Sequence, residues 1–155
     1  REIMDAAQST FISSTFWTER IGSAAALAAV RVMAKNRTPE NTNLRGEWVQ
    51  QKLVELGSEV GLKLSVTGIP ALTSFSIEGS TPPELRTLIT QEMLTIGFLA
   101  GTSLYLSEAH TEDVLLEYFE ALKSILGKYS ELIAGGKLSE ALPNGLIQEG
   151  FSRLA

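Results

Sequence analysis

The single histidine of the chain, His110, is the side chain best suited to proton transfer near neutral pH. It lies between Ala109 and Thr111, just before an expected helix. One histidine does not make a metal site without carboxylates at a matching spacing, and the sequence around it has none. Glu112 and Asp113 are adjacent and so face different directions on a helix, which is typical of solvated first-turn residues. We therefore expect His110 to be a structural residue at a helix start, and we expect no metal site.

A run of hydroxyl side chains extends from Ser9 to Ser14. No base is placed to activate these hydroxyls as nucleophiles, so the run predicts a loop. The wider segment 13–23 leads into a helix N-terminus, where hydroxyls and free N–H groups can hold a phosphate. A phosphate site and a plain packing loop both fit this segment. The chain has no Gly-rich phosphate fingerprint, and its lack of cysteine excludes thiolate chemistry and disulfides.

Composition narrows the class of protein and its partners. The 155 residues include 13 basic and 18 acidic side chains, scattered along the chain, with a net charge of −5. Nucleic acids and anionic membranes both call for a basic patch, so neither is an expected partner. No apolar run is long enough to span a membrane. The 44% hydrophobic content is that of an ordinary soluble globular protein.

Two further features bear on the compartment of the protein and on whether the chain is part of a longer polypeptide. The lack of cysteine suits a reducing compartment, so we expect a cytoplasmic protein. The first five residues contain neither an initiator methionine nor the apolar core of a signal peptide. We therefore expect the chain to be a piece of a longer polypeptide.

The elements that must position these residues begin with helices. A short opening helix followed by a loop is expected over residues 1–18, and an alanine-rich stretch then predicts a buried helix over about 20–35. Thr38 and Pro39 are typical of the N-cap and first position of the next helix. Its apolar stripe follows helical spacing and consists of Leu44, Trp48, Val49, Leu53, Leu56 and Val60.

The middle of the chain alternates between strand and helix patterns. Leu62, Leu64 and Val66 have the period of a half-buried strand, and a turn at 68–70 leads to a second strand over 72–77. Thr73, Phe75 and Ile77 share one face of that second strand. A helix follows and ends near Gly97, with a core stripe of Leu85, Leu88, Ile89, Met93 and Ile96.

The last third predicts two short strands and a long helix. Residues 98–100 and 104–106 are too short for helices and are expected as strands around Gly101. Thr111 is the expected N-cap of a helix that ends near Gly127, and its core stripe consists of Val114, Leu115, Tyr118, Phe119, Leu122, Ile125 and Leu126. Short helical pieces follow, broken at 135–136 and at Pro143. Because the strands lack regular βαβ alternation, we predict an α+β fold with a small, mostly antiparallel sheet covered by helices.

Two stretches of sequence resemble class III aminotransferases. Residues 13–28 (SSTFWTERIGSAAALA) are similar to the segment after the lysine-bearing strand of that family, where a threonine loop leads into an alanine-rich helix. Ser23 stands where the family commonly has proline. Gly97 to Ala100 and Ser107 to Asp113 resemble the end of glutamate-1-semialdehyde aminomutase and its relatives, where an Ala-His-Thr-Glu-Asp stretch opens the last helix. The resemblance covers roughly residues 1–126.

The resemblance implies the C-terminal part of a fold-type-I enzyme that uses pyridoxal 5′-phosphate (PLP). Residues 1–22 are then an interface and cofactor-phosphate loop continuing from a missing N-terminal large domain, 23–127 a small domain, and 128–155 a helical tail. The family implies a homodimer acting on a small amino donor and an acceptor. Its Schiff-base lysine lies upstream of a segment like 1–22, so no catalytic residue is expected in this chain, which by itself should be inactive.

The resemblance also implies one cofactor contact. In the family, a threonine before the alanine-rich helix reaches the cofactor phosphate of the other subunit. Counting back from Gly22 and Ser23 places Thr18 at that position, whereas matching the Ser-Thr pair places Thr15 there. A hydroxyl with neighbouring N–H groups suits a phosphate dianion in either case.

Three functions remain open at this stage. The first is an aminotransferase that moves an amino group between an amino compound and a keto acid or aldehyde. The second is an aminomutase of the glutamate-1-semialdehyde type. The third is a non-catalytic dimerisation or interaction domain that keeps the same fold. The Ser/Thr loop favours an enzyme, because a pure scaffold does not need it.

Overall fold

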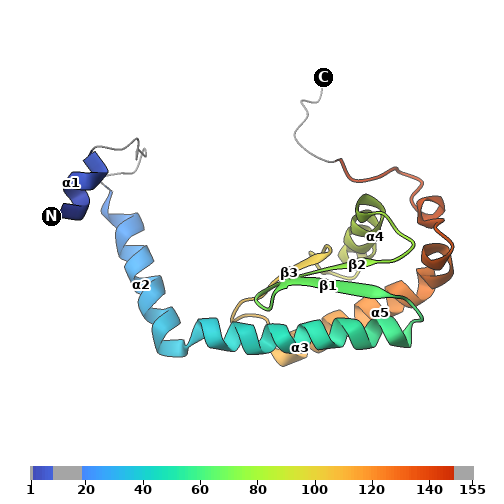
Figure 1. Ribbon diagram of the computed structural model, residues 1–155, viewed down its shortest axis with the longest axis horizontal. Helices are drawn as coiled ribbons and strands as arrows, with labels where there is room; N and C mark the ends of the chain where they lie inside the picture. Colours follow the sequence, from blue (N-terminus) through green and yellow to red (C-terminus); the bar gives the residue numbers. More distant parts are fainter. Residues whose placement is uncertain (1, 9–18, 149–155) are drawn as a thin grey trace, which may run out of the picture. The chain divides into compact units, whose positions relative to one another are not determined.

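The computed structural model describes residues 2–8 and 19–148 (Figure 1). Contacts divide the chain into two units, residues 1–37 and 38–155, and each is described by itself. The first unit contains two helices, α1 (Glu2–Gln8) and α2 (Arg20–Asn36). The second contains, in chain order, α3 (Thr38–Glu59), β1 (Leu64–Ile69), β2 (Leu72–Ile77), α4 (Pro82–Thr95), β3 (Ser103–Tyr105), α5 (Glu112–Ala134) and the 3-10 helix η1 (Leu138–Ala141).

Helix α2 forms where its alanine content predicts a helix. It ends at Asn36, and the φ of 53° at the C-cap residue Arg37 lies in the left-handed region. The expectation that this helix is buried is wrong within the chain, because every one of its residues is exposed. Alanine propensity is a local property that makes the helix, whereas burial requires a packing partner.

Within the described residues, three antiparallel strands form a sheet in the order β1-β2-β3. Strands β1 and β2 form a hairpin whose register pairs Leu64 with Ile77 and Ile69 with Leu72. As the alternation predicts, Thr73, Phe75 and Ile77 are the buried residues of β2. The prediction of a small antiparallel sheet covered by helices is thereby confirmed.

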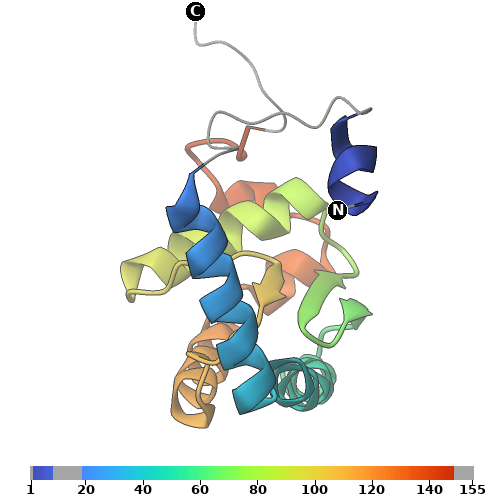
Figure 2. The same cartoon turned by 90° about the vertical axis from the view of Figure 1, so that its left-hand side faces the viewer.

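Helices cover one face of this sheet. Figure 1 shows α3 and α5 running beneath β1 and β2, and Figure 2, viewed along α3, shows α5 beside it and α4 running across. The core fills the space between these helices and the sheet. Its fully buried side chains come from all three helices and from η1, and they include Val49, Leu53, Leu88, Ile89, Met93, Leu122, Leu126 and Leu138.

Both ends of α4 are closed by specific motifs. Thr81 is its N-cap and forms a capping box with Glu84, and the backbone N–H of Thr81 donates to the Glu84 carboxylate at 2.9 Å. At the other end, the N–H of Gly97 donates to the carbonyl of Leu94, and the N–H of Phe98 donates to that of Met93. This pair of bonds is a Schellman motif and requires the positive φ of 91° that Gly97 adopts. The predicted stop at Gly97 is therefore correct.

Three expected boundaries differ from the structure. Residues 98–100 are not a strand, because the Schellman motif turns the chain out of α4 and no strand pairs with them. The first strand starts at Leu64 and runs on to Ile69, into the turn expected at 68–70. Helix α5 does not stop at Gly127 but continues to Ala134, where Ile133 is still fully buried, and the break then falls at Gly135 as expected.

Candidate functional site

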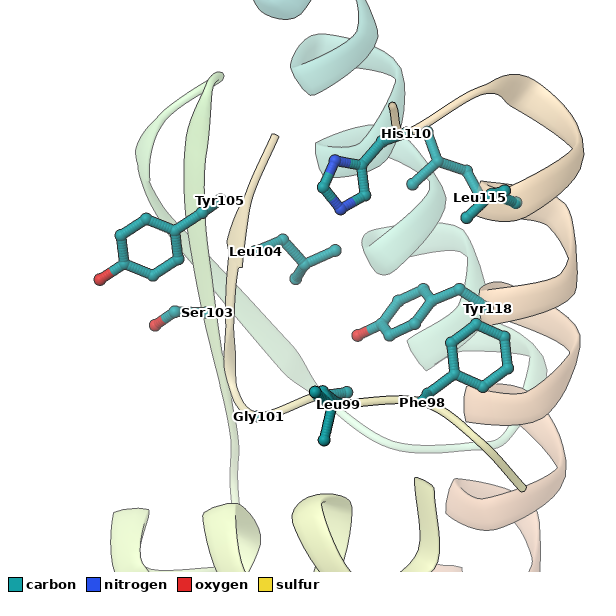
Figure 3. A pocket seen from close by; sticks show the side chains of 11 residues that line it. Phe98, Leu99, Gly101, Ser103, Leu104, Tyr105, His110, Leu115 and Tyr118 are labelled. Atoms are coloured by element: carbon teal, nitrogen blue, oxygen red, sulfur yellow. The ribbon is translucent and has the colours of Figure 1, made fainter. Parts of the chain in front are cut away.

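A cavity of about 270 Å³ lies beside the edge strand β3 (Figure 3). Three segments surround it: the irregular stretch that follows α4, β3 itself, and the first two turns of α5 together with His110, two residues before that helix. Most of its lining is apolar, and no lysine, arginine, aspartate or glutamate lines it. The lining residues are Phe98, Leu99, Ala100, Gly101, Ser103, Leu104, Tyr105, His110, Val114, Leu115 and Tyr118.

Aromatic packing holds the inner wall of the cavity. The rings of Phe98 and Tyr118 meet edge to face with centroids 6.1 Å apart, and Tyr118 also packs edge to face on Phe119 at 5.4 Å. Phe119 in turn contacts Trp48 of α3 at 5.6 Å. Edge-to-face contacts at these distances are favourable and fix ring orientation. The wall therefore continues into the core rather than forming a loose surface.

The Tyr118 hydroxyl is the unusual polar group of this wall. Tyr118 is only 7% exposed, and no described group forms a hydrogen bond with its hydroxyl. Figure 3 shows the side chain reaching from α5 toward β3, with the hydroxyl on the cavity side. Burial raises the pKa of this phenol, so at neutral pH the group is an O–H donor. Buried hydroxyls without a partner are rare in native proteins, which draws attention to the cavity in front of it.

His110 supplies the second polar group. Its Nδ1 accepts a hydrogen bond of 3.0 Å from the backbone N–H of Ser107 and lies 2.9 Å from the Ser107 hydroxyl. A backbone N–H can only donate, so this contact places the ring proton of the neutral form on Nε2. Figure 3 shows the Nε2 edge of the ring pointing into the cavity, on the same side as Tyr118.

The turn that carries His110 is itself anchored to α3. The guanidinium of Arg45 donates to the carbonyl of Ser107 at 3.0 Å, and the His110 N–H donates to the same carbonyl at 3.1 Å. Thr111 follows as the N-cap residue of α5, as predicted, but its side chain makes no cap hydrogen bond. The Ser107–His110 turn thus sets the direction of the imidazole before the helix begins.

We expect the buried Tyr118 hydroxyl to couple folding to alkaline pH. Its folded-state pKa is raised above the ordinary value of 10.0, so its contribution to stability is complete below pH 10 and is lost as pH rises through the folded pKa. The ultraviolet absorbance of phenolate measures how far the tyrosines, Tyr118 among them, are ionised. Tyr118→Phe should leave the phenolate signal of the native chain at about pH 11 unchanged and should lower the signal of the chain in denaturant by one tyrosine in three. A smaller native-state signal in the variant would show that Tyr118 ionises in the fold.

The structure and the predicted site residues overlap only in part. Thr15 and Thr18 lie outside the described residues, as does the hydroxyl run from Ser9 to Ser14. His110 is held at a helix start as expected, but it also lines a cavity that its sequence position did not indicate. Tyr118 was expected only as a member of the core stripe. The one available signal was its hydroxyl, because a tyrosine on an apolar stripe needs a polar partner.

The lysines of the described residues do not suit Schiff-base chemistry. Four of them form surface ion pairs with N–O distances of 2.6–3.1 Å, namely Lys52–Glu55, Lys63–Glu78, Lys123–Glu59 and Lys128–Glu92. Hydrogen bonds to the paired glutamates, and for Lys128 first of all the one with Tyr129, raise the lysine pKa, which is opposite to the lowering that an amine nucleophile needs. Lys35 and Lys137 are exposed.

In residues 2–8 and 19–148, no group of three or more His, Asp or Glu side chains could hold a metal ion. No helix in the same residues is long and apolar enough to cross a membrane.

Comparison with known proteins rests on structure, since no family model and no curated protein matches this sequence. A solved structure of the FumI protein of Sphingopyxis sp. MTA144, in its PLP internal aldimine form, is similar with a TM-score of 0.70. The match covers 86% of this chain and 33% of the FumI chain at 23% sequence identity. The chain has the fold of about one third of FumI.

The likeness to FumI bears on the architecture described above. With 86% of the chain covered, the helices and the antiparallel sheet are an arrangement already seen in a larger protein. The chain spans about a third of the FumI length, so most of the FumI chain has no counterpart here.

Proposed function

We propose that this chain is the C-terminal part of a PLP-dependent aminotransferase of class III, which moves an amino group between an amino compound and a keto acid or aldehyde. The observation that carries the proposal is the shared fold with FumI, whose structure was solved as a PLP internal aldimine. Two sequence stretches that resemble class III enzymes support it independently. One of them, Ala109 to Asp113, forms the start of α5 and the turn that holds His110.

The described residues do not form a complete PLP site. No described lysine is suited to hold the cofactor, so the proposal assigns that lysine to a part of the longer protein upstream of this chain. PLP, when bound there, would act as an electron sink for a carbanion at the substrate carbon. The contribution of this chain is then a phosphate contact from Thr18 or Thr15 and a small domain that lies over the site.

The exposed face of α2 supports a larger assembly. Its larger apolar side chains are all at least 44% exposed, and they are Ile21, Leu27, Val30, Val32 and Met33. Soluble proteins rarely leave such a row uncovered, and alanine neighbours allow another backbone to approach closely. The proposal places this face against the large domain and the second subunit of a homodimer.

An aminomutase of the glutamate-1-semialdehyde type is the second candidate. The Ser107 to Asp113 stretch favours it, because this stretch resembles that enzyme group most closely. Intermolecular and intramolecular amino transfer differ in the substrate rather than in the small domain. Product analysis with separate donors and acceptors, compared with a single amino aldehyde, distinguishes the two.

The proposal is tested by cofactor binding to the longer protein of which this chain is the C-terminal part. With PLP and candidate amino donors, we expect a visible absorbance of protein-bound cofactor that changes when a donor is added. Thr18→Val should weaken PLP binding roughly ten- to a hundredfold, because a hydrogen bond to a charged group is lost. Thr95→Val, at a hydroxyl that bonds only the Glu92 carbonyl, is the matched control and should bind PLP normally.

Each outcome has a distinct meaning. Unchanged PLP affinity in Thr18→Val would assign the phosphate contact to Thr15 instead. Thr15→Val then tests that assignment. A longer protein that binds no PLP would contradict the proposal and favour a non-catalytic interaction domain. Cofactor absorbance from the 155 residues alone would contradict the assignment of the lysine to another part of the protein.

A further inference from the structure

We propose that the cavity between β3 and α5 binds a small neutral carbonyl compound, whose oxygen accepts hydrogen bonds from the Tyr118 hydroxyl and from Nε2–H of His110. This site is separate from the phosphate contact assigned to Thr18 or Thr15. It involves only residues 98–118 and does not depend on whether the longer protein is an aminotransferase.

The first support is the state of the Tyr118 hydroxyl. It is buried, no described group bonds to it, and it faces the cavity. Phenylalanine would fill the same place in the aromatic wall without leaving a polar group unpaired. A hydroxyl at this position therefore costs stability unless something in the cavity bonds to it.

The second support is the direction of the His110 ring. Because Ser107 occupies Nδ1, the proton lies on Nε2, which points into the same cavity. The two donors thus both lie on the lining of one cavity. A carbonyl oxygen has two lone pairs and can accept from both, whereas an ammonium group would meet two donors with no acceptor of its own.

Charge selects a neutral ligand over a carboxylate. No lysine or arginine lines the cavity, and Arg45, which contacts the turn that carries His110, donates a guanidinium N–H to the Ser107 carbonyl. A carboxylate transferred to this apolar surrounding would lack a compensating positive charge and would lose its hydration. Phe98, Leu104 and Leu115 instead offer contacts to an apolar body.

The size of the cavity supports an organic ligand. A volume of about 270 Å³ is much larger than one water requires, and apolar lining gives water few partners. Ligand sites of proteins commonly combine such apolar walls with a few convergent polar groups. Acetophenone is a suitable probe, because it joins a phenyl ring to a single neutral carbonyl.

The experiment titrates the 155-residue chain with acetophenone and follows the imidazole resonances by NMR. His110 is the sole histidine, so its ring signals need no further assignment. We expect a saturable shift of these signals. Ethylbenzene has a similar shape but no acceptor, and benzoate has a charged one, so both should bind at least about threefold more weakly.

Matched tyrosine variants locate the contact. Tyr118→Phe should weaken acetophenone binding about three- to tenfold and leave ethylbenzene binding unchanged. Tyr129→Phe is the control, because that hydroxyl bonds Glu92 at 2.9 Å and does not line the cavity. It should bind both compounds like the unaltered chain. His110→Phe, followed through the ligand's own signals, should weaken acetophenone binding independently of Tyr118→Phe.

Three results would overturn the proposal. The first is equal affinity for acetophenone and ethylbenzene, or no saturable binding of acetophenone. The second is unchanged acetophenone affinity in Tyr118→Phe, which would leave the hydroxyl without a role in binding. The third is tighter binding of benzoate than of acetophenone, which would assign the cavity to an anion.

Discussion

Gly46→Ala is expected to destabilise the chain by about 3 kcal/mol, one of the largest effects of any single methyl group added to it. Gly46 lies inside α3 where the helix touches the β1–β2 hairpin, and a Cβ there would collide with the backbone carbonyl of Pro70. Backbone atoms cannot rotate away as a side chain can, so the helix and hairpin would have to separate. Urea denaturation of the 155-residue chain measures the loss.

Gly127→Ala is the matched control for this prediction. It is the same substitution inside a helix, but a Cβ at Gly127 in α5 would meet no other atom within 4 Å. Removing a helical glycine should then stabilise by about 0.5–1 kcal/mol, because the unfolded chain loses conformational freedom. Equal effects of the two substitutions would refute the close approach of α3 to the hairpin.

The contact at Gly46 also matters for the cavity. It seats the hairpin on α3, where Gln50 additionally donates to the Gly68 carbonyl at 3.3 Å. Strand β3 pairs with β2, so a hairpin that shifts carries the cavity's edge strand with it. Gly46→Ala should therefore also weaken acetophenone binding, although the residue is not part of the cavity lining.

Leu122→Ala should cost about 3 kcal/mol of unfolding free energy. Leu122 of α5 is completely buried in the core that α5 shares with α3 and α4. Truncation removes apolar contacts and leaves a cavity that three helices cannot easily close. Thermal and urea denaturation should both show the loss.

Leu116→Ala on the same helix is the control. Leu116 is 45% exposed, so its truncation should change stability by less than about 1 kcal/mol. A comparable loss at Leu116 and Leu122 would mean that α5 does not present the face seen here to the core.

The helices and the main hairpin could be predicted because their signals are local. Val49, Leu53 and Leu56 of the predicted stripe face the core in α3, whereas Leu44 is 65% exposed. Phe75 and Ile77 share the buried face of β2. Side-chain periods of 3.6 and 2 residues follow from backbone geometry alone, so apolar spacing reveals the element and its inward face.

The predictions that differ from the structure do so because of tertiary contacts. Residues 98–100 are apolar and were expected as a strand, but a strand needs a partner, and the turn after α4 leads them along the cavity instead. Gly127 was expected to end α5, yet buried contacts beyond it, such as Ile133, outweigh a helix propensity cost of about 1 kcal/mol. The burial expected for α2 depends on a surface that its own unit does not supply.

By itself, the sequence determined that His110 stands at a helix start and that Tyr118 lies on a buried stripe, because both follow from spacing along one element. Only the tertiary structure decided that the two face one cavity. Their meeting depends on the Ser107 hydrogen bonds that orient the imidazole and on the placement of β3 opposite α5. Such relations join residues from separate elements through packing, and no local pattern of residue types encodes them.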